Sequence, residues 1–118
     1  MPHRRLFDYI RDGLEAIDLI EQAASGLTVD DFAADRDKLD AVPYRLITIG
    51  ESVRHLPESL QDAFPDIEWD QIRAMRNYLM HVYWGVEPAI VWQTNRDDLP
   101  PLRQALLSLA SRVAELDA

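Results

Sequence analysis

The chain has 118 residues, of which 47% are hydrophobic and 28% are charged, and its formal net charge at pH 7 is -9. This length and composition are typical of one globular domain, spanning residues 1–118, that can bury a core of its own. The sequence contains no cysteine, which excludes disulfides and thiolate metal sites and is consistent with a reducing cytosol.

The distribution of apolar and charged residues argues against a membrane-spanning helix, a signal peptide and nucleic-acid binding by the whole surface. No apolar run reaches the roughly 18 residues that a membrane helix requires, and the segment MPHRRLFDYIRDGLEAI does not resemble a signal peptide. We therefore expect a cytoplasmic protein without a membrane contact. The acidic excess disfavours nonspecific nucleic-acid binding over the whole surface. A local basic site is compatible with it, because salt screens charges beyond about 10 Å.

Apolar residues recur at steps of three and four along most of the chain, which is the spacing of amphipathic helices. The first stripe predicts a helix that ends before Gly26, and this glycine is expected to be its C′ residue. The apolar positions of this helix are Leu6, Ile10, Leu14, Ile17 and Ile20. The polar stretch SGLTVDDFAADRD, residues 25–37, is expected to join it to the next helix.

The second stripe predicts a helix over residues 39–56, with apolar positions at Leu39, Val42, Leu46, Ile49, Val53 and Leu56. Pro43 lies inside this pattern, so the helix is expected either to start near Asp40 or to kink. Gly50 lies in the middle of the helix, where glycine costs about 1 kcal/mol relative to alanine. The usual reason for such a glycine is the close approach of another helix.

The segment PESLQDAFPD, residues 57–66, indicates a short turn or helix. Asp66 is then expected to cap a third long helix that runs to about Trp84, with Gly85 as its stop. VEPAIVWQTNRDD, residues 86–98, indicates another short helix.

The last helix is expected to begin at Asp98 with Pro100 and Pro101 in its first turn. Its apolar stripe consists of Leu102, Leu106, Leu109, Val113 and Leu116. No strand alternation or internal repeat is present. The sequence therefore predicts an all-α, antiparallel (up-and-down) bundle of four main helices plus one or two short helices.

The stretch RAMRNYLMHVYWG, residues 73–85, concentrates chemically versatile side chains on the third long helix. On a helical wheel, its core face is an arc of about 60° formed by Ile72, Met75, Leu79, Val82 and Val86. Arg76 and Tyr83 lie nearly in line at the border of this arc, about 10 Å apart along the axis. Asn77 and His81 are neighbours on the far side and can touch.

The arc between those two pairs is occupied by Arg73, Met80 and Trp84, where a solvated helix would carry glutamates and lysines. An aromatic residue, a methionine and arginines on a non-core face have the composition of an interface centre. Two explanations remain open. Another helix of the same chain covers this face, or the face packs near its own copy in a homodimer.

The same helix offers groups suited to phosphate chemistry. His81 can act as a general acid or base near neutral pH. Arg76 can hold a phosphate bidentately and stabilise the charge that develops during its transfer. Asn77 could orient the imidazole from one turn away. In a two-fold dimer, two copies of His81 and Arg76 could converge in one groove and cleave RNA through attack of a ribose 2′-OH.

Metal and cofactor sites find little support in the sequence. His81 has no H-x-x-x-H or H-E-x-x-H partner, and no phosphate loop or dinucleotide fingerprint is present. Glu51 is interpreted as a polar residue that pairs with an arginine from a neighbouring helix, and Arg54 and His55 as a solvated helix end or part of a basic patch. Trp69 and Trp92 are expected to pack inside the bundle. We predict no metal and no cofactor.

The segment RNYLMHVYWGV resembles the R-x-x-x-x-H-x-Y motif of HepT-like toxins in the HEPN superfamily. The resemblance extends over nearly the whole chain. It includes DGLEAIDLI in the first helix, YRLITIGESVRHLP in the second, FPDIEWDQIRAMRN before the motif, and VW with DDLPPL after it.

This resemblance implies a homodimeric helical bundle that acts on RNA, such as tRNA or mRNA, as a metal-independent endoribonuclease. The resemblance also implies that the chain is the toxin of a type VII toxin–antitoxin system. By position, Arg76 and His81 match the paired catalytic residues, and Asn77 matches the auxiliary polar residue after the arginine. Tyr83 matches the tyrosine that a cognate minimal nucleotidyltransferase antitoxin adenylylates. Arg73, by contrast, is predicted from the helical wheel, together with Met80 and Trp84, to contact RNA or the second subunit.

Two other functions are compatible with the sequence. Some HEPN proteins are not nucleases, so the alternative is a non-catalytic interaction subunit that binds a nucleotidyltransferase partner. In that case the surface around Trp84 and Met80 would matter and His81 would not. A helical bundle with a ligand pocket is a third possibility, which no sequence feature favours.

Overall fold

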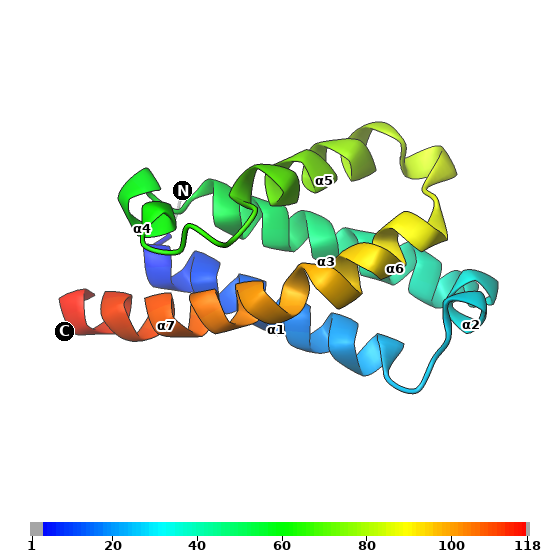
Figure 1. The fold of residues 1–118 in the computed structure, drawn as a ribbon, viewed down its shortest axis with the longest axis horizontal. Helices are drawn as coiled ribbons and strands as arrows, with labels where there is room; N and C mark the ends of the chain where they lie inside the picture. Colours follow the sequence, from blue (N-terminus) through cyan, green and yellow to red (C-terminus); the bar gives the residue numbers. More distant parts are fainter. Residues whose placement is uncertain (1–3, 118) are drawn as a thin grey trace.

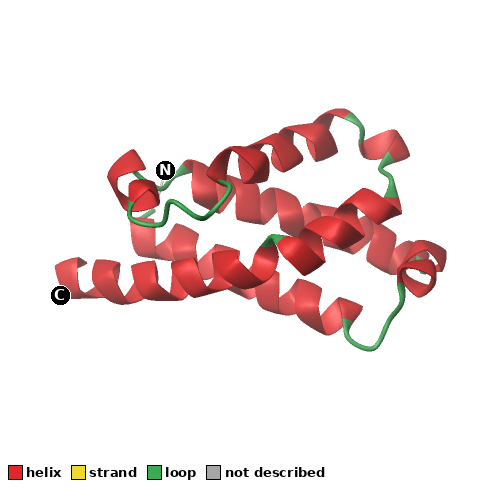
Figure 2. Ribbon diagram, viewed as in Figure 1, coloured by secondary structure: helices red, strands yellow, loops and turns green. Residues whose placement is uncertain are grey.

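The computed structural model describes residues 4–117, and their regular elements are all helical (Figures 1 and 2). In chain order they are α1 (Leu6–Ala24), α2 (Val29–Ala34), α3 (Arg36–Arg54), α4 (Glu58–Asp62), α5 (Trp69–His81), the 3₁₀ turn η1 (Tyr83–Gly85), α6 (Pro88–Asp97) and α7 (Leu99–Asp117). α3 lies between α1 and α5, and α7 packs against α1 and α6. The predicted all-α bundle is confirmed.

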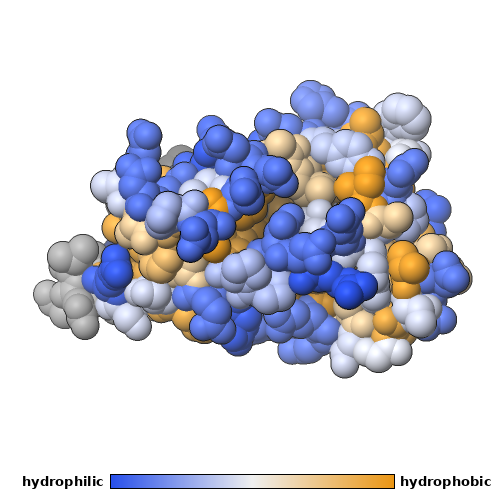
Figure 3. Space-filling model, in the orientation of Figure 1, coloured by the Kyte–Doolittle hydropathy of each residue, from blue (hydrophilic) through white to orange (hydrophobic). Residues whose placement is uncertain are grey.

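The predicted apolar stripes form one continuous core. Its most deeply buried side chains are Ile10, Ile17, Ile20, Phe32, Val42, Ile49, Val53, Leu79, Leu99, Leu102, Leu106 and Leu109. Trp69 is buried, and Trp92 packs against Phe32 with ring centroids 5.4 Å apart, so both tryptophans pack the bundle as predicted. Val113 is also buried, whereas the side chain of Leu116 lies outside the described side chains. The face that carries α6 and α7 is largely hydrophilic (Figure 3).

The connection after α1 is only partly as expected. Gly26 has φ of +75°, the left-handed conformation that glycine adopts readily, and it follows the last turn of α1 as predicted. The polar stretch after it is not a simple linker, because residues 29–34 form α2. Thr28 Oγ1 accepts a hydrogen bond from the Asp31 amide and Asp31 Oδ2 accepts one from the Thr28 amide, at 3.1 and 3.0 Å. This capping box starts the helix, and burial of Phe32 holds it on the core.

α3 begins earlier than the apolar stripe indicated. Asp35 caps it by accepting a hydrogen bond from the Lys38 amide at 3.2 Å, and the helix then continues through Pro43. The alternative of a start near Asp40 is therefore wrong. The short helix predicted after Pro57 is confirmed as α4.

α5 is shorter at both ends than predicted. It starts at Trp69 rather than after Asp66, because the Trp69 indole donates hydrogen bonds to the carbonyls of Gln61 and Phe64 and so ties the preceding loop to α4. It ends at His81, because Val82 leaves helical geometry with φ of −117° and ψ of 30° and the turn η1 follows. Tyr83 and Trp84 therefore lie in the turn η1, and the helical wheel does not apply to them.

Asn95 on α6 is an exception to the pairing of buried polar groups. Its Oδ1 and Nδ2 atoms are buried and have no hydrogen-bond partner among the described residues. The residue borders a cavity of about 260 Å³ that is also lined by Ile20, Ala24 and Trp92. An unpaired buried amide costs about 1–3 kcal/mol, whereas an apolar side chain of the same size is favourable there.

We therefore expect Asn95→Leu to raise the free energy of unfolding by about 1–3 kcal/mol, measured by urea denaturation. Gln93→Leu, at an exposed position of the same helix, is the matched control and should not stabilise the protein. A loss of stability in Asn95→Leu would mean that the amide is satisfied in solution.

No helix in the described part of the chain combines the length and the apolar character needed to cross a bilayer.

Candidate functional site

The candidate site begins at the contact between α3 and α5. A Cβ atom added to Gly50 would lie 2.6 Å from the Cβ of Arg76, a distance that real Cβ atoms do not approach. The predicted close approach of another helix at Gly50 is therefore confirmed. This approach places the residue after the glycine, Glu51, beside Arg76.

Arg76 is held between two polar side chains. Its Nε lies 3.2 Å from Glu51 Oε2, and its Nη1 donates a hydrogen bond to Asn77 Oδ1 at 3.3 Å. The Nε atom is buried and its N–H is not aligned for a hydrogen bond, so the contact with Glu51 is an ion pair. The side chain as a whole is 22% exposed, which leaves part of the guanidinium accessible. The interpretation of Glu51 as the partner of an arginine from a neighbouring helix is confirmed.

Asn77 and His81 lie in the last turns of α5, and both are exposed. Asn77 is engaged with Arg76, and no hydrogen bond joins it to His81 in the described part of the chain. His81 is the last residue of the helix. The guanidinium of Arg76 and the imidazole of His81 are therefore carried by one rigid element, five residues apart.

Arg73 lies elsewhere. It forms an ion pair with Asp70 and donates a hydrogen bond from Nη1 to Gln61 Oε1 at 3.0 Å. It borders a cavity of about 480 Å³ beside α4 whose lining also includes Glu58, Asp62 and Glu68. Arg76 does not line this cavity; it lines a separate groove, described below, to which Arg73 does not contribute. Its predicted contact with RNA or a second subunit remains a prediction.

The non-core side chains of this region are open to solvent. Tyr83 and Trp84 are each 79% exposed in η1, and Met80 on α5 is 48% exposed. The explanation that another helix of the same chain covers Met80 and Trp84 is therefore wrong.

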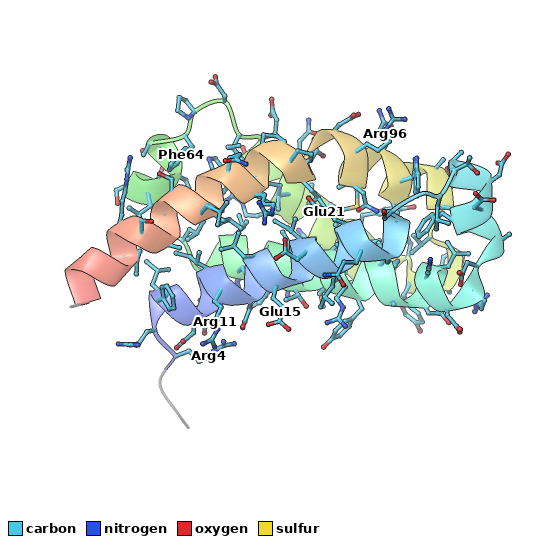
Figure 4. The ribbon with its side chains drawn as sticks, turned by 90° about the horizontal axis from the view of Figure 1, so that it is seen from below. Arg4, Arg11, Glu15, Glu21, Phe64 and Arg96 are labelled. Carbon is cyan, nitrogen blue, oxygen red and sulfur yellow. The ribbon has the colours of Figure 1, made fainter. Side chains whose placement is uncertain are left out.

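Arg76 and Met80 form one wall of a groove over α3, which we call the α3 groove. Its volume is about 250 Å³, and α1, α3, α5 and the segment before α1 line it. The lining residues are Arg4, Tyr9, Asp12, Tyr44, Ile47, Thr48, Glu51, Ser52, Arg76 and Met80. Arg4 lies over the ring of Tyr9, 4.8 Å from its centroid. Figure 4 shows Arg4 on the side of the molecule opposite to Arg96 of α6.

Sequence reasoning missed the contributions of Arg4, Tyr9 and Tyr44 to this groove, because they come from α3, α1 and the segment before α1, whose placement relative to α5 the pattern does not specify. Gly50 was the available signal, since a mid-helix glycine indicates where the neighbouring helix crosses. Among the described residues, no group of three or more His, Asp or Glu side chains has an arrangement that could hold a metal ion.

An all-α bundle that carries arginine, histidine and tyrosine on and just after one helix, in the order R-x-x-x-x-H-x-Y, is a HEPN-type domain. Residues 14–109 match the family model described as "Ribonuclease HepT-like". The chain therefore belongs to the HepT-like ribonuclease family, as its sequence predicted.

Curated relatives agree with this assignment. The chain is 35% identical over 96 residues to "Probable ribonuclease HepT" of Thermococcus cleftensis, a match that covers 81% of the chain and 87% of the relative. It is 33% identical over 109 residues to "Gamma-glutamylcyclotransferase and putative RNase" of Methanocaldococcus jannaschii, covering 92% of the chain and 48% of that longer protein. A third relative, "Putative RNase" of Caldanaerobacter subterraneus, is 27% identical over 104 residues, covering 88% of the chain and 93% of the relative. No solved structure matches the chain significantly.

Proposed function

We propose that the protein is the toxin of a type VII toxin–antitoxin pair and cleaves RNA without a metal ion, with Arg76 and His81 as its catalytic residues. The observation that carries this proposal is the R-x-x-x-x-H-x-Y motif in a HepT-like chain, with Arg76 held at one end by Glu51 and partly exposed at the other. Loss of cleavage in His81→Ala tests it.

The chemistry is a transesterification at one phosphate. The ribose 2′-oxygen attacks phosphorus and loses its proton to a general base, while the bond from phosphorus to the 5′-oxygen breaks and a general acid protonates the leaving oxygen. Arg76 stabilises the negative charge on the phosphoryl oxygens. His81 serves as base or acid. One chain supplies a single imidazole in this motif, so the second proton transfer uses His81 of a second copy.

A homodimer would bring the two motifs together. The α3 groove and the turn η1 expose aromatic and apolar side chains, among them Tyr44, Met80, Tyr83 and Trp84. Aromatic residues and methionine are enriched at the centres of protein interfaces. These surfaces lie on or beside the helix that carries Arg76 and His81, so a contact between copies there would place both half-sites in one cleft.

Tyr83 is the proposed target of the antitoxin. It is 79% exposed and follows His81 by two residues, so a nucleotidyltransferase can reach its hydroxyl. Attack of the phenol oxygen on the α-phosphorus of ATP forms a tyrosyl–AMP ester and releases pyrophosphate. The attached AMP adds bulk and negative charge near the site, which repels the RNA phosphates.

We expect co-expression with the cognate minimal nucleotidyltransferase to add one or more AMP groups at Tyr83 and to abolish RNA cleavage. Intact-mass and peptide mass spectrometry would detect the adduct. Tyr83→Phe is the matched control and should stay unmodified and active. A neutralised toxin with unmodified Tyr83 would argue for a different antidote.

The second candidate function is that of a non-catalytic subunit that binds a nucleotidyltransferase. The exposed pair Tyr83–Trp84 favours it, because a docking partner would bury both rings. Under this function, His81→Ala would be silent in cells, whereas Trp84→Ala would weaken the complex.

A further inference from the structure

The Glu51 carboxylate is divided between Arg76 and a second set of partners. Oε2 lies 3.2 Å from Arg76 Nε, whereas Oε1 lies 3.2 Å from His55 Nε2 and 3.3 Å from Arg54 Nη1. Among the described side chains, Glu51 provides the only carboxylate in ion-pair contact with Arg76. The carboxylate is therefore a hub that links the end of α3 to the middle of α5.

His55, in turn, is held by α1. Its ring stacks on Tyr9 with centroids 3.9 Å apart and an interplanar angle of 14°. The guanidinium of Arg4 also lies over the Tyr9 ring. Because three helices contribute to the arrangement, Glu51 is less free to rotate than a solvated glutamate.

The hub is ionised at neutral pH. Burial raises the pKa of Glu51, but the hydrogen bond with His55 and the positive charges of Arg54 and Arg76 outweigh it, so the net pKa lies below its ordinary value. The Glu51 carboxylate is thus negatively charged beside Arg76 Nε. The same carboxylate also contacts Arg54 and His55.

Fixing Nε determines where the rest of the guanidinium points. The group is planar, so an anchor at Nε leaves the Nη edge to meet other partners. Nη1 donates a hydrogen bond to Asn77 Oδ1 at 3.3 Å. Asn77 is exposed and lies one helical turn before His81. The Nη edge is the part of the group that can bind a phosphate bidentately.

We propose that Glu51 is a positioning residue, which holds Arg76 with its Nη edge toward the scissile phosphate. This role rests on the proposed ribonuclease function. Glu51 does not contact the RNA. Its charge acts on the Nε side, where the positive charge of Arg54 offsets its repulsion of the phosphate.

The test is Glu51→Gln, which keeps the shape of the side chain and removes its charge. We expect kcat for RNA cleavage to fall by about 10- to 100-fold, the usual effect of losing a group that orients a catalytic residue, with KM changed far less. Glu51→Asp, which keeps the charge on a shorter side chain, should recover part of kcat. Glu58→Gln, an exposed carboxylate on α4, is the matched control and should cleave like the wild type.

A second readout does not depend on activity. The Arg76 Nε–H signal in a ¹H–¹⁵N spectrum, assigned with Arg76→Lys, should shift in Glu51→Gln relative to the wild type, because the charge 3.2 Å from Nε is lost. The positioning role is supported if Glu51→Gln and Glu51→Asp are both folded, Glu51→Gln loses cleavage, and the Nε–H signal of Glu51→Gln is changed. An unchanged Nε–H signal, or an unchanged kcat, overturns it. A wild-type protein that cuts no RNA overturns the proposed function instead, and the spectrum still decides whether Glu51 holds Arg76.

Discussion

Replacing His81 with alanine should lower the rate of RNA cleavage by about 10²- to 10⁴-fold, because the reaction loses a positioned acid or base. Arg76→Ala should lower it by about 10²- to 10³-fold, through loss of charge stabilisation at the phosphate. His81 is exposed at the end of α5, so its removal leaves the core intact. The rates are measured on a labelled RNA under single-turnover conditions, with circular dichroism and light scattering to compare fold and oligomeric state.

Arg96→Ala is the matched control for these variants. Arg96 is exposed on α6, and Figure 4 shows it on the opposite side of the molecule from Arg4, which lines the α3 groove. It should cleave RNA at the wild-type rate. Cleavage that survives both His81→Ala and Arg76→Ala would assign the activity to other residues.

Gly50→Ala should reduce the free energy of unfolding by about 1–3 kcal/mol, the cost of overpacking a close contact. The usual effect of this substitution in a helix is a gain of up to about 1 kcal/mol. Here the added Cβ meets the Cβ of Arg76 at 2.6 Å, and neither atom can rotate away. α3 and α5 must separate, which also lengthens the contact between Glu51 and Arg76 and should lower the cleavage rate.

Urea denaturation measures this loss, and an unchanged m value would show that the unfolding transition stays the same. The control is Gly85→Ala in η1, where an added Cβ has no neighbour within 4 Å, and the stability should not change. A Gly50→Ala protein as stable as the wild type would mean that the two helices separate at no cost.

The fold was largely predictable because its information is local. Each long helix carries an apolar stripe whose period reports the buried face, and Gly26 and Gly50 marked a helix end and a helix crossing. α2 was missed although its capping box is legible in TVDD, since its polar composition suggested a linker. The end of α5 was misplaced by three residues, because the apolar period continues through Val82 and Val86 after the backbone has left the helix.

The candidate site was predictable only where it lies within one element. Arg76, Asn77 and His81 follow from the motif on α5. The sequence predicted that Glu51 pairs with an arginine from a neighbouring helix, but it could not identify that arginine as Arg76. The identity depends on the rotation of α3 against α5. The hydrogen bond from Arg73 to Gln61 depends on how the loop after α4 places that helix beside α5. Long-range packing of this kind leaves no periodic signal in a single sequence.

The central claim is that Arg76 and His81 cleave RNA through its 2′-hydroxyl without a metal ion. The most direct measurement incubates the purified protein with excess EDTA, a single-stranded RNA and the DNA of the same sequence, and analyses the product ends by mass spectrometry. The proposed chemistry predicts that RNA is cut to fragments ending in a 2′,3′-cyclic phosphate, that DNA stays intact, and that His81→Ala leaves the RNA essentially uncut over the same time. Cleavage of the DNA, or RNA cleavage only when a divalent metal is restored, would contradict it.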